Sequence, residues 1–126
     1  MRIGELSRRA GTSARSIRYY EQQGLLLARR QPNGYRDYDE ADLLLVREIR
    51  SLLVNGFDLE EIRPFVDCLH AGIRSRRACP GGIEVYRRKL EELDARVTAL
   101  QAVRDRVQAE LSQLESGAAA REEASA

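Results

Sequence analysis

Arginine and tyrosine side chains recur at short intervals in one stretch of the chain, between Ser13 and Tyr38. The planar guanidinium of arginine fits phosphate oxygens and guanine edges, and a tyrosine hydroxyl can donate to a phosphate oxygen. Such side chains hold a nucleic-acid backbone. With the serine that opens the stretch, the candidates for this chemistry are Ser13, Arg15, Arg18, Tyr19, Tyr35, Arg36 and Tyr38.

The charge of the chain is concentrated in one segment. The formal net charge of the 126 residues is +1, yet eight arginines stand against two glutamates between Met1 and Arg36. A basic segment in a nearly neutral chain is typical of a nucleic-acid-binding face. The same arginines would also suit an ordinary solvated helix, and it is the basic hairpin beside them that favours DNA.

A second group of side chains that could react or bind a metal consists of Cys68, His70 and Cys79. Pro80 suits the first turn of a helix, which would place Cys79 at a helix N-terminus, where a thiolate is favoured. A reactive thiol or a reversible Cys68–Cys79 disulfide is one hypothesis, and the disulfide requires Cα atoms within ~7 Å. Two inert, half-buried cysteines are another. Zinc or another thiophilic metal is a third and has the least support, because these residues are one ligand short of four unless a second subunit supplies it.

The elements that would position the first group begin with two short helices. Leu6 and Ala10 share one face of a helix that Gly11 ends, and Thr12-Ser13 offers an N-cap for the next helix. In that second helix Ile17 and Tyr20 would face inward, leaving Arg15, Arg18 and Tyr19 outward. A helix, a tight glycine turn and a second helix form the helix-turn-helix signature.

A hairpin follows an apolar strap, Leu25–Leu27. Asn33-Gly34 lies between short extended arms and predicts a type I′ turn, because both residues tolerate positive φ. The return arm carries Tyr35, Arg36 and Tyr38, so the hairpin is expected to act as a wing beside the second helix.

Two further helices are expected. Asp39 caps one that runs to Asn55, and Asp58 with Glu61 forms a capping box for the next. Pro64 is expected to kink or end this last helix, with the residues to Gly72 as a frayed continuation. The apolar face of the first of the two is predicted to comprise Leu43, Leu44, Val46, Ile49, Leu52 and Leu53.

Beyond Gly82, apolar residues repeat at steps of three and four, as in a coiled coil, with Arg104 at the one interrupted position. A continuous helix from 83 to 114 would be ~48 Å long and could not bury this stripe alone, so a second copy of the chain is the expected partner. The predicted dimerisation residues are Ile83, Tyr86, Leu90, Leu93, Val97, Leu100, Val107, Leu111 and Leu114.

The resulting domain plan is a DNA-binding domain over 1–71, a linker over 72–82, a dimerisation helix over 83–115 and a disordered tail over 116–126. No apolar run approaches the ~18 residues that a membrane span needs, so we expect a cytoplasmic protein without a membrane partner. Cysteines in that compartment are normally reduced.

Three segments, IGELSRRAGTSARSIRYYEQQGLL, NGYRDYDEADL and NGFDLEEI, in this order resemble the DNA-binding half of the MerR family of transcription regulators, from Met1 to about Val66. The resemblance implies a mainly α protein with a winged helix-turn-helix, a short β-hairpin wing and a long C-terminal helix that dimerises as an antiparallel coiled coil. It also implies a homodimer that binds a pseudo-palindromic promoter site in double-stranded DNA and distorts it so that RNA polymerase can engage.

By position, the resemblance assigns Ser13 and Arg15 to the base-reading start of the second helix. It assigns backbone-contacting or wing roles to Arg18, Tyr19, Tyr35, Arg36 and Tyr38. Metal-sensing members place one cysteine near the start of the dimerisation helix, which Cys79 matches, and further ligands after that helix, where this sequence has neither Cys nor His.

Two alternatives come from other classes. One is a thiol-disulfide exchange enzyme that uses Cys68 and Cys79, against which the lack of a C-x-x-C motif and of an α/β pattern counts, so we expect no enzyme. The other is an architectural DNA-binding protein similar to excisionases, which usually lack so long a dimerisation helix.

Overall fold

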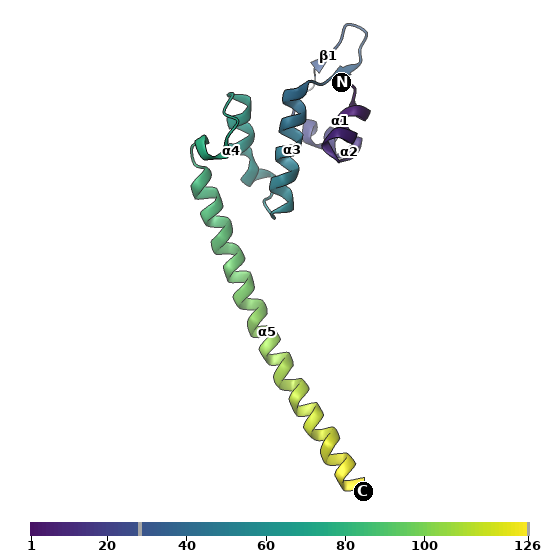
Figure 1. Cartoon of the computed structure of the whole chain (residues 1–126), viewed down its shortest axis with the longest axis vertical. Helices are drawn as coiled ribbons and strands as arrows, with labels where there is room; N and C mark the ends of the chain where they lie inside the picture. Colours follow the sequence, from purple (N-terminus) through teal and green to yellow (C-terminus); the bar gives the residue numbers. More distant parts are fainter. Residues whose placement is uncertain (28, 126) are drawn as a thin grey trace. The chain divides into compact units, whose positions relative to one another are not determined.

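A computed structural model describes residues 1–27 and 29–125 of the chain. The predicted mainly α fold is confirmed. In order, the elements are α1 (Ile3–Ala10), α2 (Ala14–Gln22), β1 (Arg29–Arg30), β2 (Arg36–Asp37), α3 (Glu40–Val54), α4 (Leu59–His70), the short 3₁₀ helix η1 (Arg76–Ala78) and α5 (Gly82–Ser125) (Figure 1). The chain divides into two compact units, Met1–Val85 and a second that begins at Tyr86, and each is described by itself.

The turn between α1 and α2 has the predicted form. Gly11 has φ 70°, a left-handed conformation that ends α1, and the side chain of Ser13 accepts a hydrogen bond from the Ser16 N–H at 3.1 Å. Arg50 of α3 donates to the carbonyl of Ala10 at 2.9 Å and so ties this turn to the next helix. The helix-turn-helix is therefore fixed by its own caps and by α3.

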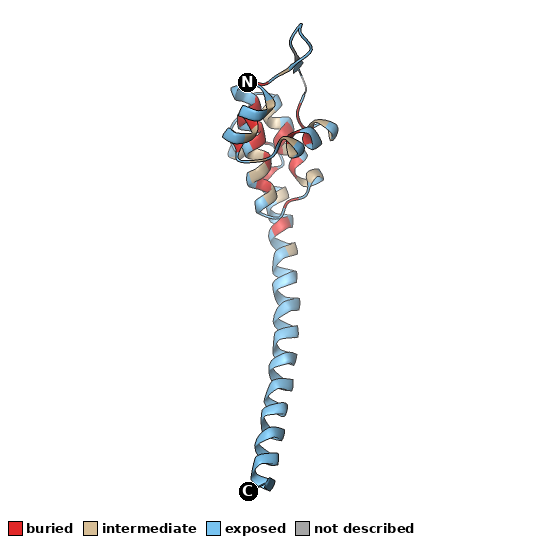
Figure 2. Ribbon diagram, turned by 90° about the vertical axis from the view of Figure 1, so that its right-hand side faces the viewer, coloured by how far each residue is buried: buried red, intermediate tan, exposed pale blue. Residues whose placement is uncertain are grey.

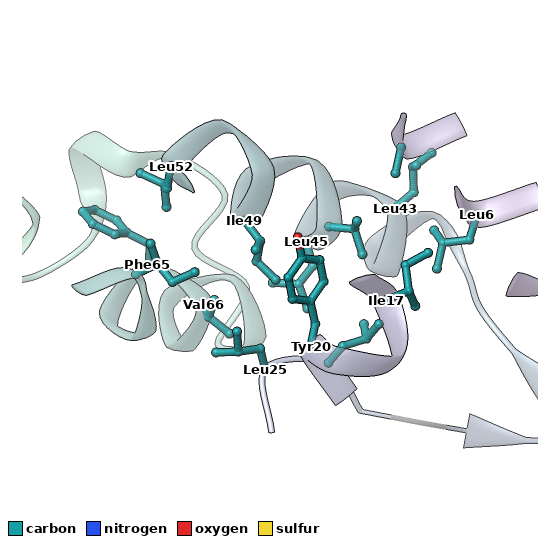
Figure 3. Packing of buried hydrophobic residues seen from close by; sticks show 14 of the residues in the cluster. Leu6, Ile17, Tyr20, Leu25, Leu43, Leu45, Ile49, Leu52, Phe65 and Val66 are labelled. Atoms are coloured by element: carbon teal, nitrogen blue, oxygen red, sulfur yellow. The ribbon is translucent and has the colours of Figure 1, made fainter. Parts of the chain in front are cut away.

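The core of the first unit lies between α1, α2, α3 and α4. Figure 3 shows Tyr20 beside Leu45 and Ile49, with Leu6, Ile17 and Leu43 toward one end and Phe65 with Leu52 toward the other. The predicted face of α3 was wrong at one position: Leu44 is 36% exposed, whereas Leu45 is buried. Three consecutive helical leucines span about 200°, so they cannot all point to one side.

The wing, which we define as the hairpin Arg29–Asp37, pairs β1 with β2 antiparallel, with Arg29 opposite Asp37 and Arg30 opposite Arg36. The predicted type I′ turn is wrong. Gly34 has φ 88° but Asn33 has no positive φ, and the hydrogen bonds run from Gly34 N–H to Gln31 O at 2.8 Å and from Gln31 N–H to Tyr35 O at 2.7 Å. Pro32 explains the difference, because its fixed φ suits the second position of a type I turn and it has no N–H for a tighter hairpin.

Helix α4 starts at the predicted capping box of Asp58 and Glu61 and continues through Pro64 to His70, so the expectations that Pro64 ends it and that the following turn frays are wrong. Pro64 removes only one backbone donor, and Phe65 and Val66 beside it are buried in the core. The helix ends in a Schellman motif, with Gly72 at φ 86° and Ile73 N–H donating to Cys68 O at 2.8 Å.

The segment 72–82, expected as a linker, is fastened to the first unit. Arg76 forms an ion pair with Glu48 of α3 and donates to the hydroxyl of Ser51 at 3.0 Å. Cys79 is buried. This part of the chain is therefore held in place by side chains that α3 and α4 contribute.

Helix α5 has 44 residues, which corresponds to a length of ~66 Å. The expectation of disorder from residue 116 is wrong, since the helix continues to Ser125; the alanines and glutamates there favour helix, and only Gly117 opposes it. Figure 2 shows most of this helix as exposed. Within the described residues, no helix combines the length and the apolar character that crossing a membrane requires.

Candidate nucleic-acid interface

Helix α2 presents one polar stripe to solvent. Arg15, Arg18, Tyr19 and Gln22, which follow one another at helical spacing, are all exposed, while Ile17 and Tyr20 on the other side are buried. The prediction that only one of the adjacent tyrosines is buried is confirmed. Arg15, Arg18 and Tyr19 therefore share one accessible face, and Gln22 extends it by one turn.

Ser13 stands exposed at the start of this face, where it has a structural task as well. Its Oγ accepts from the Ser16 N–H and donates to the Ser16 Oγ, both at 3.1 Å. The Ser13 hydroxyl therefore caps α2. The contact of Ser13 with a base edge stays a prediction.

The wing presents Tyr35 and Arg36 near the start of the chain. Tyr35 is 55% exposed, and the guanidinium carbon of Arg2 lies 4.3 Å from the centre of its ring, a cation–π contact. Arg36 is half-buried, and its Nε lies 3.4 Å from Oε2 of Glu21 in α2. Arg36 is thus tied to the helix that carries the exposed stripe.

Tyr38 corrects the sequence prediction. Its side chain is 1% exposed, and its hydroxyl donates to the Glu21 carboxylate. Burial, followed by this hydrogen bond, raises the pKa of Tyr38 above its ordinary value. The Tyr38 hydroxyl therefore cannot reach a phosphate, and it secures the end of the wing to α2 instead.

Glu21 is a residue that sequence reasoning missed. Its side chain is only 7% exposed, and it contacts both Tyr38 and Arg36. An acidic residue in the middle of a basic segment could have been a signal, because a lone carboxylate there needs a basic or hydroxyl partner.

Arg29 fastens the other strand of the wing to α3. Its Nη2 lies 3.0 Å from Oδ2 of Asp39 and 2.8 Å from Oδ2 of Asp42. The Asp42 N–H donates to Asp39 Oδ1 at 2.9 Å, which lowers the pKa of Asp39, whereas burial raises the pKa of Asp42. The two strands of the wing are thus fixed to different helices.

The sensor candidates are brought together only in part. Cys68 of α4 and Cys79 form a disulfide, with Cα atoms 5.8 Å apart. His70 lies near them in sequence, but its Nε2 is 3.0 Å from the carbonyl oxygen of Leu25. The bonded sulfurs present no thiolate, and the described residues contain no cluster of three or more His, Cys, Asp or Glu side chains placed to hold a metal. In this state the donor set does not fit a metal ion.

The predicted dimerisation residues of α5 are all exposed, from 37% at Tyr86 and Leu93 to 74% at Ile83. Val103, which the sequence interpretation left out, is a further exposed apolar residue next to the interruption at Arg104. We call these ten apolar residues the seam.

A helix-turn-helix with a basic outer stripe, followed by an arginine- and tyrosine-bearing hairpin, defines a winged helix-turn-helix DNA-binding protein. Two family models match the chain, MerR HTH family regulatory protein over residues 1–67 and MerR, DNA binding over residues 41–109. The chain belongs to the MerR family of DNA-binding transcription regulators.

Similar proteins agree with this assignment. The HTH-type transcriptional regulator HmrR of Rhizobium leguminosarum bv. viciae is 35% identical over 104 residues, which are 82% of this chain and 78% of HmrR. The HTH-type transcriptional regulator ZntR of Escherichia coli (strain K12) is 33% identical over 111 residues, or 85% of this chain and 75% of ZntR. The structure of the transcription regulator PbrR691 from Ralstonia metallidurans CH34, in complex with lead(II), has a TM-score of 0.70 and 28% identity, covering 86% of this chain and 82% of that one.

Proposed function

We propose that this regulator binds a pseudo-palindromic promoter site as a homodimer, controls transcription by distorting that DNA, and takes the redox state of Cys68 and Cys79 as its signal. The observation that carries the DNA-binding part is the shared exposure of Arg15, Arg18 and Tyr19 on α2 beside the wing residues Tyr35 and Arg36.

The two contact regions have different tasks in this proposal. The start of α2, with Ser13 and Arg15, reads base edges in the major groove, and Arg18, Tyr19 and the wing hold phosphates and set the register. Glu21 links α2 to the wing through Tyr38 and Arg36. A rigid link of this kind favours DNA whose groove and backbone meet both regions at once.

Dimerisation follows from the seam. A single helix of ~66 Å with ten exposed apolar residues leaves a stripe that another copy can cover, as two coiled-coil strands do. An antiparallel pairing would duplicate the DNA-binding unit about a two-fold axis, which matches a pseudo-palindromic site. RNA polymerase at the promoter is the further partner that this proposal expects.

Distortion of the DNA between the two half-sites costs on the order of several kcal/mol of elastic energy. The backbone contacts of two α2 helices and two wings would offset that cost. Because two DNA shapes would then have similar free energies, a small change in the dimer could move the complex between them.

In this proposal the Cys68–Cys79 disulfide is the element that responds to the redox signal. It joins α4, which packs in the core of the first unit, to the segment immediately before α5. A small-molecule dithiol, or two molecules of a cellular thiol, would deliver two electrons and two protons by exchange and be oxidised to a disulfide, breaking the Cys68–Cys79 bond and leaving two thiols. Release of this link would change how firmly the start of α5 is held.

Metal sensing is the second candidate, since PbrR691 was solved with lead(II) and Cys79 matches the first cysteine position of metal-sensing members. It requires prior reduction of the disulfide. A thiol-disulfide exchange enzyme is disfavoured because Cys79 is only 7% exposed, which shields its sulfur from a protein substrate.

The test is DNA binding and promoter transcription with the oxidised chain, the reduced chain and the Cys68→Ser/Cys79→Ser double variant. We expect a dimer to bind in all three cases and transcription to differ between the oxidised and reduced chain only where both cysteines are present. Equal transcription in all arms would contradict the redox input and leave DNA binding intact.

A further inference from the structure

A cleft lies between the start of α1 and the wing, outside the stripe of α2. Its volume is about 680 Å³, and it is lined by Arg2, Ile3, Gly4, Gly34, Tyr35 and Arg36. All six lining residues are described, and they include two cations and no carboxylate. The cleft therefore has the charge of an anion site.

Arg2 is placed at this cleft by the wing. Its guanidinium lies over the ring of Tyr35 at 4.3 Å, and the side chain is otherwise exposed. A cation–π contact orients the guanidinium plane while leaving its N–H edges free to donate. The position of Arg2 is thus set before any ligand binds.

Arg36 links the cleft to α2. Glu21 engages the Nε of Arg36, an interaction that leaves the two terminal nitrogens of the guanidinium for another acceptor. Because Glu21 belongs to α2, the same ion pair fixes the distance between the exposed stripe and this cleft. An anion in the cleft and a DNA backbone bound by α2 would therefore be held at a fixed distance from each other.

We propose that the cleft binds a backbone phosphate of the same DNA, with Arg2 as its principal ligand and with Tyr35 and Arg36 as the other donors. This inference rests on the proposed use of α2 and the wing as the DNA-binding face. It adds Arg2, at the very start of the chain, to the residues that hold the duplex.

The test measures the salt dependence of affinity for a duplex that the wild-type chain has selected from a random-sequence pool. Each neutralised phosphate contributes about 0.9 to the slope of log K against log salt for duplex DNA. Arg2→Ala should lower the slope by about that amount per half-site and weaken binding about tenfold per half-site at low salt. Arg2→Lys should keep most of the slope, because it keeps the charge. The matched control is Arg8→Ala, an exposed arginine in the last turn of α1.

A second variant separates binding from folding. A Cβ at Gly4 would meet no atom within 4 Å, so Gly4→Glu fits, and an acidic residue in the first helical turn suits the helix dipole. Gly4→Glu should therefore leave thermal stability unchanged or higher while it weakens DNA binding about tenfold, because it places a carboxylate at the mouth of the cleft.

Equal slopes for wild type, Arg2→Ala and Gly4→Glu would overturn the inference, provided that wild type binds and that Arg18→Ala binds more weakly. Failure of the wild-type chain to select any duplex would instead overturn the proposed function. A third outcome also counts against the inference: stabilisation by inorganic phosphate that depends on Arg2, with unchanged DNA affinity, would assign the cleft to a free anion.

Discussion

The hydroxyl of Tyr38 donates a hydrogen bond to the carboxylate of Glu21, and this contact joins the end of the wing to α2. Both side chains are almost completely buried, and the Nε of Arg36 lies 3.4 Å from the second oxygen of the same carboxylate. A buried carboxylate is stable only while such partners remain. One acidic side chain of α2 therefore links the two proposed DNA-contacting regions directly.

Tyr38→Phe tests this link. It keeps the buried ring but removes one donor from a buried charge, so we expect a loss of about 1–3 kcal/mol in the free energy of unfolding. Tyr35→Phe is the matched control, since the Tyr35 side chain is exposed, and it should change stability by less than about 0.5 kcal/mol. Urea denaturation of both variants provides the measurement, and equal stabilities would refute the role given to the Glu21–Tyr38 contact.

The disulfide should stabilise the first unit. Cys68 and Cys79 are 11 positions apart in sequence, and closing a loop of that size restricts the unfolded chain by about 3 kcal/mol in the chain-entropy treatment. Reduction of the wild-type chain should therefore lower its urea midpoint. The Cys68→Ser/Cys79→Ser variant should match the reduced chain and should not respond to reductant. A midpoint that reductant leaves unchanged in the wild type would show that the bond contributes nothing.

The pKa values of two aspartates at the start of α3 should be shifted in opposite directions from the ordinary value. Asp39 has a lowered pKa because it accepts the Asp42 N–H, so its stabilising effect is complete at neutral pH and is lost as the pH falls through that lowered value. Burial raises the pKa of Asp42, so the folded chain takes up that proton before the unfolded chain does, and the protonation favours folding.

Carboxyl NMR titration should accordingly place the midpoint of Asp42 above the ordinary value of ~3.9 and that of Asp39 below it. Asp39→Ala should cost about 1 kcal/mol at neutral pH through loss of the cap, and the difference from wild type should shrink in acid. Asp39→Asn, which can still cap the helix, serves as the control. The reverse order of the two midpoints would contradict the assigned environments.

The seam should be the dimer contact. Leu100→Asp places a charge among the exposed apolar residues of α5 and should convert the dimer to a monomer at micromolar concentration, because an unpaired charge cannot be buried between two helices. Ala102→Asp introduces the same charge off the seam and should leave the dimer intact. Sedimentation velocity distinguishes the two states, and dissociation by both variants, or by neither, would argue against this surface.

Local signals in the sequence were enough to predict the end of α1 and the starts of α2, α3 and α4. Gly11, Ser13, Asp39 and Asp58 act through their own backbone neighbours, so each could be recognised without knowing the fold. The split between buried Tyr20 and exposed Tyr19 followed in the same way from helical geometry.

The features that were mispredicted depend on contacts between distant residues or on competition between neighbours. Tyr38 was predicted to contact DNA because its neighbours in sequence give no sign of its hydrogen bond to Glu21, which lies 17 positions away. The turn at Asn33-Gly34 differs from the predicted type because Pro32 precedes it. Leu45, and not Leu44, is buried on the inner face of α3. The pairing of Cys68 with Cys79 remained open because it depends on how the segment after α4 folds back.

The most direct test of the central claim is the salt dependence of duplex binding by Arg18→Ala. Arg18 lies in the exposed stripe of α2, and its loss should weaken binding uniformly across sequences and reduce the salt slope by about 0.9 per half-site. Arg106→Ala, an exposed arginine of α5 off the seam, should bind like wild type. If Arg18→Ala and Arg106→Ala both bind with the affinity and slope of the wild-type chain, then α2 is not the surface that holds DNA.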